Sequence, residues 1–248
     1  MALAITLLAG AFFLLGAAVA WRVRGVHAVA VYSLAIAFGS LAFVAAFDLI
    51  PEAIEAVEVL GWPVALLLTT GGALVLIALD RVMPDHHTRD HVHEQAHDER
   101  EVEEDVAHIG NMAVLAISVH NLAEGAAIYA ISTQDVAAGL ALAIGVGLHN
   151  APLGMLLYAP GEDGRRRETA VLVAASLSTF AGGLLMFLLG GLLDESVMLG
   201  VVCLALGMIV YILFAELLPA MIRGSEVKRS VAGIAIGAAF VLAGMSLG

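Results

Sequence analysis

The chain has 248 residues, of which 61% are hydrophobic and 14% are charged, and its mean hydropathy is +0.96. These values lie far above the averages of soluble proteins and predict an all-α polytopic membrane protein that forms a single transmembrane domain over residues 1–248. A single cysteine, Cys203, excludes a disulfide framework within one chain. The net charge of −12 comes largely from one loop, and we expect lipid around the protein and no nucleic-acid partner.

Eight apolar stretches are long enough to cross a bilayer as helices, which takes about 20 residues. The first could be mistaken for a signal peptide, but no basic residue precedes it, so we interpret it as a spanning helix. Turn residues and charged residues separate the stretches from one another. The expected spans are residues 2–20, 28–50, 62–79, 106–131, 136–158, 169–191, 196–217 and 229–247.

The basic residues predict how the spans are oriented. All 11 lysine and arginine residues lie in alternate connections, whereas the other connections hold acidic residues and no basic one. Because cytoplasmic loops of membrane proteins are enriched in Lys and Arg, we expect both termini outside and the long connection 81–105 in the cytoplasm. A wrong helix count would have scattered the charges, so the pattern also supports eight spans. The expected location is the plasma (inner) membrane.

The second and seventh expected spans end in similar sequences. Asp48-Leu49-Ile50-Pro51 ends the second, and Glu216-Leu217-Leu218-Pro219 ends the seventh. The two copies leave the membrane on opposite sides, as in the inverted repeats of transporters, and the spans then follow a 3+2+3 arrangement. Independent helix ends are the alternative explanation. Asp48 and Glu216 are each a candidate secondary metal ligand or a structural hydrogen-bond partner.

The long connection between the third and fourth spans is rich in histidine and acidic residues. Its composition predicts a solvated and mostly disordered cytoplasmic segment. It is either a plain linker or a low-affinity metal-catching segment, and His108, just inside the fourth span, could pass metal inward. The connection contains five histidines among nine acidic residues: His86, His87, His91, His93 and His97.

The fourth expected span carries a polar group in the sequence S-V-H-N-L-A-E-G, residues 118–125. His120 and Glu124 are four residues apart, so their side chains lie on one helical face, with Asn121 on a neighbouring face. A charged residue at mid-membrane costs about 2.5–3.5 kcal/mol on insertion scales, which indicates a function. An imidazole, a carboxylate and an amide oxygen can form half of a metal site.

The fifth expected span supplies residues for the other half of this metal site. His149 and Asn150 begin a second H-N-x-x-x-G pattern, and Pro152 within it removes a backbone hydrogen bond. Two such spans joined by a short turn form a hairpin in which the His-Asn pairs face each other. Polar residues that merely hold helices together are the alternative. Imidazole, carboxylate and amide ligands suit Zn²⁺, and also Fe²⁺, Mn²⁺, Co²⁺ or Cd²⁺.

These features together resemble the ZIP (zinc/iron-regulated transporter-like) family, on the side of its bacterial members. The resemblance covers the whole chain and includes the eight spans, the outside termini, the His-rich cytoplasmic loop and the H-N-x-x-E-G motif. It implies transport of divalent metal, zinc foremost, into the cytoplasm by alternating access, with no enzyme cofactor and a homodimer as a candidate assembly. The implied ligands are His120, Asn121, Glu124, His149 and Asn150.

Two departures from the family pattern bear on the number of metals bound. Many relatives have a carboxylate where this chain has Leu153, and many have Glu-Pro in the sixth span near Ala181-Gly182-Gly183. We therefore expect one metal rather than a bridged pair.

Two other classes of function are kept as alternatives. One is a membrane metal sensor that does not transport. The other is an intramembrane zinc metallohydrolase built on His120, His149 and Glu124, although such an enzyme would also need a general base, and Leu153 replaces the spare acid.

Overall fold

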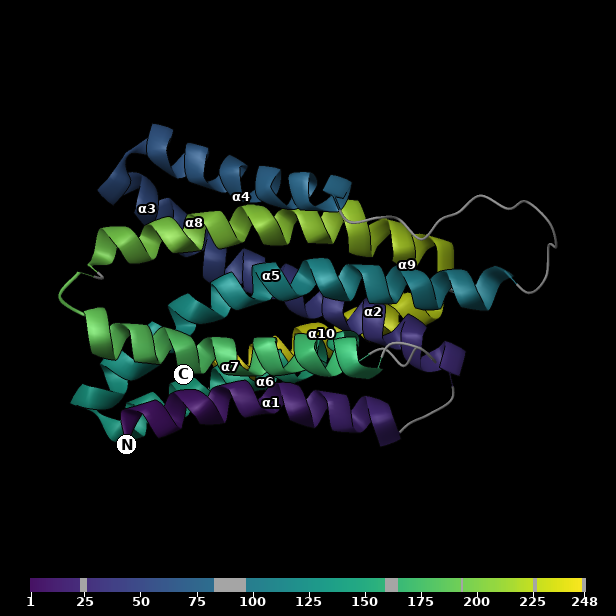
Figure 1. Cartoon of the computed structure of the whole chain (residues 1–248), viewed down its shortest axis with the longest axis horizontal. Helices are drawn as coiled ribbons and strands as arrows, with labels where there is room; N and C mark the ends of the chain where they lie inside the picture. The colour runs from purple at the N-terminus through teal and green to yellow at the C-terminus, as the bar shows by residue number, and fades with distance from the viewer. Residues whose placement is uncertain (23–25, 83–96, 159–164, 193, 225–226, 247–248) are drawn as a thin grey trace.

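The computed structural model describes residues 1–22, 26–82, 97–158, 165–192, 194–224 and 227–246. Over these residues the chain is helical, and eight helical stretches are long and apolar enough to cross a membrane. Most of the helices run side by side along the long axis of the molecule (Figure 1). The predicted all-α fold with eight spans is therefore confirmed.

The spans follow one another in the order expected. The elements are α1 (Ala2–Arg22), α2 (Val26–Val44), η1 (Ala45–Leu49), α3 (Ile50–Leu60), α4 (Trp62–Val82), α5 (His97–Gln134), α6 (Val136–Leu157), α7 (Arg165–Leu189), α8 (Glu195–Tyr211), η2 (Ile212–Leu217), α9 (Leu218–Gly224) and α10 (Val227–Met245). The second span consists of α2, η1 and α3, and the seventh consists of α8, η2 and α9.

The fourth span begins earlier than predicted. Helix α5 starts at His97, nine residues before the expected start at residue 106. The residues that follow His97 include several acids, and acidic residues stabilise the first turns of a helix through its dipole. His97 and His108 therefore lie on α5. The other loop histidines of the prediction lie outside the described residues: His86, His87, His91 and His93.

The internal repeat has a structural counterpart. Both η1 and η2 are π-helical, and each ends two residues before the proline of its four-residue copy. The amide of Ile50 donates to the carbonyl of Ala45, and the amide of Leu218 donates to the carbonyl of Leu213, five residues back in each case. Proline lacks an amide hydrogen and crowds the carbonyl four residues before it, which a wider turn relieves. The two copies thus share a backbone conformation as well as a sequence pattern.

Close backbone contacts divide the helices into sets. A side chain at Gly16 of α1 would clash with the carbonyl of Ala151 in α6, and one at Gly125 of α5 would clash with the carbonyl of Thr179 in α7. Helices α1 and α7 approach each other in the same way. We call α1, α5, α6 and α7 the ligand-bearing block. Among the remaining helices, similar contacts join α2 to α10 and α4 to α8, while α6 also approaches α10.

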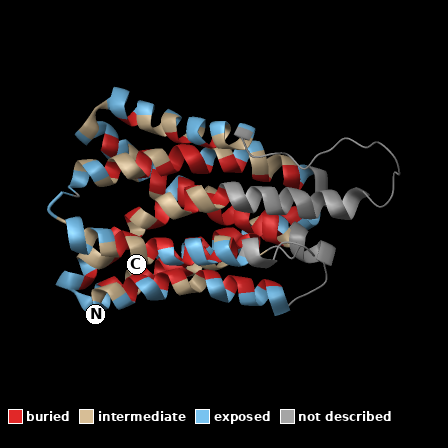
Figure 2. Ribbon diagram, viewed as in Figure 1, coloured by how far each residue is buried: buried red, intermediate tan, exposed pale blue. Residues whose placement is uncertain are grey.

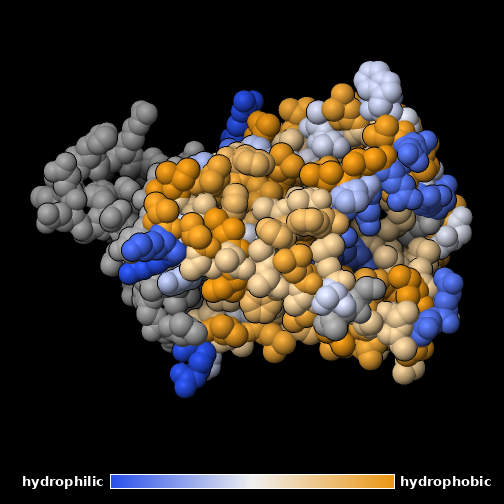
Figure 3. Space-filling view, turned by 180° about the vertical axis from the view of Figure 1, so that it is seen from behind, coloured by the Kyte–Doolittle hydropathy of each residue, from blue (hydrophilic) through white to orange (hydrophobic). Residues whose placement is uncertain are grey.

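The surface fits a lipid environment. Buried residues lie along the inner faces of the helices and exposed ones on their outer faces (Figure 2). Many of the exposed side chains are large and apolar, including Leu67 of α4 and Leu188 of α7. In the face shown in Figure 3, hydrophobic residues cover the middle of the molecule, and hydrophilic residues gather toward its two ends. Such a belt is what a bilayer requires of a surface in contact with acyl chains.

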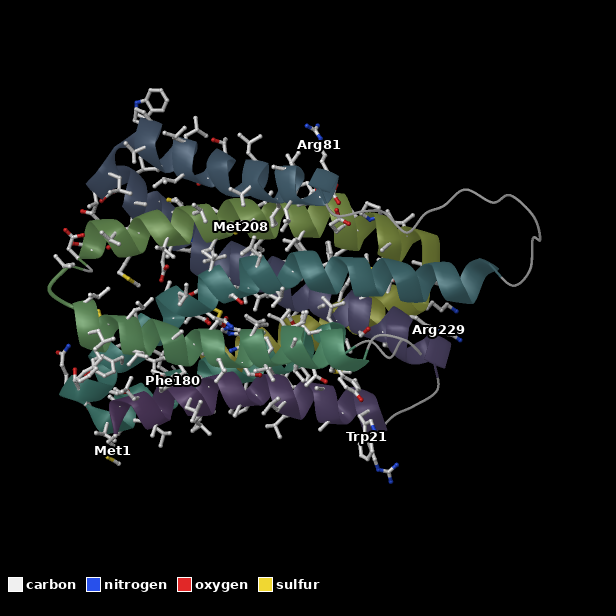
Figure 4. All side chains as sticks on the ribbon, viewed as in Figure 1. Met1, Trp21, Arg81, Phe180, Met208 and Arg229 are labelled. Atoms are coloured by element: carbon white, nitrogen blue, oxygen red, sulfur yellow. The ribbon has the colours of Figure 1, made fainter. Side chains whose placement is uncertain are left out.

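Basic residues gather at one end of the molecule. Arg81 and Arg229 lie at the end opposite Met1 (Figure 4). Helix α3, which carries Glu52, Glu55 and Glu58, and the start of α8, which carries Asp194 and Glu195, lie at the Met1 end (Figure 1). The segregation of charge is as the sequence predicts, and the side of the membrane that each end faces stays a prediction from the positive-inside rule.

Candidate metal site

Three side chains from the two predicted motifs meet inside the bundle. The carboxylate of Glu124 lies between two imidazoles, with its Oε1 atom 3.2 Å from His120 Nε2 and 2.8 Å from His149 Nε2. His120 and Glu124 come from adjacent turns of α5, and His149 comes from α6. One ligand atom from each residue lies within 4.8 Å of the others. We call these three residues the triad.

The triad is shielded from its surroundings. His120 is 3% exposed, His149 is 8% exposed, and the side chain of Glu124 is 9% exposed. Within the described part of the chain, both ring nitrogens of His120 and Nε2 of His149 lack a hydrogen bond of good geometry. Buried polar atoms without good hydrogen bonds are costly, so nitrogens left in this way indicate a group that binds something.

The spacing of the triad matches one metal ion. Zinc binds nitrogen at about 2.0–2.1 Å and oxygen at about 2.0–2.2 Å, so neighbouring ligand atoms of a tetrahedral site are about 3.3–3.4 Å apart. The two distances from Glu124 Oε1 are 3.2 and 2.8 Å. Small rotations of the side chains would therefore let all three residues bind the same ion.

Asn121 packs between α5 and α7. It is fully buried, and its amide lies 3.0 Å from Ser178 Oγ on α7. The amide orientation that satisfies every neighbour accepts a hydrogen bond from Ser178 and donates to Glu124 Oε2 and to the carbonyl of Ile117, each at 3.2 Å. Asn121 is then positioned to orient the triad carboxylate. Ser178 was not singled out by the sequence analysis, since a serine in an apolar helix carries no local signal of its partner.

Asn150 is also fully buried, next to His149 on α6. Neither atom of its amide has a hydrogen-bond partner among the residues that the structure describes. Helix α6 continues through Pro152. A fully buried amide with no protein partner has the capacity to bind a water molecule or an ion.

A cavity of about 340 Å³ is lined by His120 and Glu124 of the triad and by residues of α3 and of the start of α8, two segments that lie at the end of the molecule where the N-terminus lies (Figure 1). The ligand-bearing block lines one side, through α5, α6 and α7, and η1, α3 and α8 line the other. Four acidic side chains border it in addition to Glu124: Asp48, Glu52, Glu55 and Glu195. The spacing of residues 48, 52 and 55 places the first three on one helical face, a signal that the sequence already contained.

The two acids of the internal repeat occupy different surroundings. Asp48 Oδ2 lies 4.0 Å from His120 Nε2, beside the triad. Glu216 does not line the cavity. Close to it in the chain, the hydroxyl of Tyr211 donates to Asp80 Oδ2 at 3.2 Å. Of the two acids of the repeat, the structure therefore brings only Asp48 close to the triad.

The two positions that depart from the family pattern are occupied by residues that pack against neighbouring helices. Leu153 is 2% exposed and belongs to the main hydrophobic core. A side chain at Gly182 would clash with the backbone of Leu122 on α5. Neither position offers a second carboxylate to the triad.

The sequence has relatives along most of its length. Zinc transporter ZupT of Escherichia fergusonii is 30% identical over 227 residues, which cover 88% of this chain and 85% of the relative. Zinc transporter ZupT of Enterobacter sp. (strain 638) is 29% identical over 231 residues, and that of Salmonella arizonae is 27% identical over 226 residues, with the same shares covered. No family model matches the chain.

Proposed function

Because the chain belongs to the ZIP (zinc/iron-regulated transporter-like) family, we propose that it carries divalent transition-metal ions, zinc foremost, across the membrane into the cytoplasm. The observation that supports this most strongly is the buried triad of His120, Glu124 and His149, at the inner limit of an acid-lined cavity. The relatives are named as transporters, and we propose transport in preference to the hydrolase and the sensor.

The donor set of the triad suits transport. Two imidazoles and one carboxylate bind Zn²⁺ and also Fe²⁺, Mn²⁺, Co²⁺ and Cd²⁺. The single cysteine, Cys203, packs in a separate hydrophobic cluster, so no thiolate holds a soft metal at the triad. Asn121 and Asn150 complete the shell in this proposal, directly or through water. A site of this kind binds metal and can also release it.

We infer that one metal ion binds at a time within the hairpin of α5 and α6. Two divalent ions about 3.5–4 Å apart need shared carboxylates to offset their repulsion, and that repulsion is strong where the dielectric constant is low. Glu124 is the only acid of the triad, and Leu153 and Gly182 leave no second bridging group. Anomalous diffraction from crystals soaked in Zn²⁺ or Cd²⁺ should show one strong peak there. Two strong peaks about 4 Å apart would contradict this inference.

The transport step proposed here is a rigid-body movement of the ligand-bearing block. All three triad residues belong to this block, and close backbone contacts join α1 to α6, α5 to α7 and α1 to α7. The cavity runs along the boundary between this block and η1, α3 and α8. A shift along that boundary would expose one intact site first to one side and then to the other. The internal repeat supports such a movement.

Uptake into proteoliposomes tests the proposed function. The wild-type protein should accumulate Zn²⁺ in a saturable way, detected by a dye trapped inside the vesicles. His120→Ala, Glu124→Ala and His149→Ala should each lose most of this uptake, whereas Glu58→Gln, an exposed acid that does not line the cavity, should retain it. Wild-type protein that binds zinc without accumulating it would support a sensor. Full uptake by Glu124→Ala would overturn the assignment.

A further inference from the structure

Among the glycines that the structure describes, only Gly244 of α10 brings the backbone of the ligand-bearing block against the backbone of a helix outside the block. A side chain at Gly244 would clash with the carbonyl group of Gly145 in α6. At the other described glycines where an added side chain would clash with the backbone of another helix, both helices belong to the block, or to the pairs α2–α10 and α4–α8. Gly145 and Gly244 are both buried. Because such an approach needs residues without side chains, the contact holds α6 against α10 at this point.

The cavity lies at a different part of the boundary between the block and the other helices. It is lined by α5, α6 and α7 on one side and by η1, α3 and α8 on the other, and no residue of α2 or α10 lines it. Gly145 precedes His149 by four residues on α6, so the contact lies about one helical turn from a residue of the triad. The block therefore touches α10 closely while a space of about 340 Å³ separates it from α3 and α8.

A sliding movement of the block along α10 would meet an obstacle at this contact. Helix α10 begins near Arg229, at the end of the molecule opposite Met1, so a site that moves away from the Met1 end moves toward earlier residues of α10 (Figure 4). Val241 lies three residues before Gly244 on the same helical face and is 1% exposed within the main hydrophobic core. A slide of one turn, about 5.4 Å, would press the backbone of Gly145 against the side chain of Val241. A rotation about the contact avoids this clash, because the point of contact stays in place.

We propose that the ligand-bearing block turns about the contact between Gly145 and Gly244, which acts as a pivot, and does not slide past α10. The inference deepens the proposed function and rests on its rigid-body step. In a rotation, displacement grows with distance from the axis, so the triad moves little. Helix α7, which packs against α1, α5 and α6, moves farther, and the cavity closes as the block swings toward α3 and α8.

Distances between paired spin labels test this proposal. Double cysteine variants in a Cys203→Ala background carry nitroxide labels, and double electron–electron resonance in lipid nanodiscs measures each distance with and without Zn²⁺. Leu140→Cys of α6 with Met245→Cys of α10 places labels at exposed positions close to the pivot, and Leu188→Cys of α7 with Ile54→Cys of α3 places them across the boundary that contains the cavity. The second pair should shift several-fold more than the first. A slide would shift both pairs to a similar extent and would overturn the proposal.

A pair within the block serves as the matched control. Leu14→Cys of α1 with Val173→Cys of α7 places both labels on exposed positions of the block, and their distance should stay constant. Constant distances in all three pairs would overturn the pivot and the rigid-body step together. Wild-type protein that turns about the pivot but accumulates no Zn²⁺ in vesicles would overturn the proposed function alone.

The variant Gly244→Ala gives a second measurement that needs no label. Its methyl group would force α6 and α10 apart at the pivot, so the maximal rate of Zn²⁺ uptake should fall several-fold. The triad itself is left intact, and its Zn²⁺ affinity in detergent should stay unchanged. Gly71→Ala of α4 is the control, because an added side chain there meets no atom within 4 Å, and it should keep the wild-type rate. A wild-type rate in Gly244→Ala would overturn the pivot.

Discussion

The segments η1 and η2 have the same sequence pattern and the same π-helical backbone, but their acids have different neighbours. Asp48 in η1 faces the cavity and approaches His120 to 4.0 Å. Glu216 in η2 does not border that cavity, and the nearby Tyr211 bonds to Asp80 of α4. An acid, two aliphatic residues and a proline therefore determine the turn, while the packing of the surrounding helices determines what the acid can contact.

The largest effect is expected at the carboxylate that the triad shares. Glu124→Ala removes the only acid of the triad and leaves His120 and His149 without the group between them. We expect this variant to lose more Zn²⁺ affinity than any other variant considered. Its uptake should fall to the level of empty vesicles. Equilibrium Zn²⁺ binding, with circular dichroism to confirm the helical fold, provides the measurement. Retained Zn²⁺ binding would show that the metal binds at a place other than the triad.

Replacing each of the two acids of the repeat by alanine tests this comparison directly. Asp48→Ala should weaken metal binding at the triad about tenfold or more, because it removes a carboxylate that lies 4.0 Å from His120 Nε2. Glu216→Ala should leave the triad affinity in detergent unchanged, because Glu216 lies away from the cavity in this conformation. Parallel Zn²⁺ titrations of the two variants measure the difference. An equal loss of affinity in both would mean that the two halves of the repeat act on the triad in the same way.

The sequence predicted the repeat but could not predict its asymmetry. The eight spans and the meeting of His120, Glu124 and His149 follow from apolar length and from the spacing of two motifs, which are local properties. The position of η1 beside the triad depends on how α5 packs against α8 and α7, which no short pattern encodes. The same limit applies to Ser178, which contacts Asn121 from another helix. The early start of α5 at His97 was missed because composition predicted a solvated loop there.

A smaller effect is expected from the hydrogen bond that Asn121 donates to Glu124 Oε2. Asn121→Ala and Ser178→Ala should each reduce Zn²⁺ affinity by a few-fold, because Glu124 Oε2 loses a donor or that donor loses its support. If Ser178 acts on Glu124 only through Asn121, the double variant should bind Zn²⁺ with about the same affinity as Asn121→Ala alone. A double-mutant cycle measures this coupling. Additive losses would indicate that Asn121 acts independently of Ser178, for example as a direct metal ligand.

The smallest effect is expected from the His-rich connection between α4 and α5. The last turn of α4 and the first turn of α5, which this connection joins, lie at the end of the molecule opposite Met1 (Figures 1 and 4). If only the η1 side supplies metal to the triad in this conformation, replacing His86, His87, His91 and His93 by serine should leave the maximal rate of Zn²⁺ uptake unchanged. A metal-catching role would instead change uptake or regulation at low metal concentration, where a weak local site raises the supply of ions. Uptake measured over a range of Zn²⁺ concentrations separates these effects, with Asp48→Ala measured alongside. Complete loss of uptake in the folded serine variant would place the connection on the transport pathway. It would also show that the η1 side is not the only part of the protein that supplies metal to the triad.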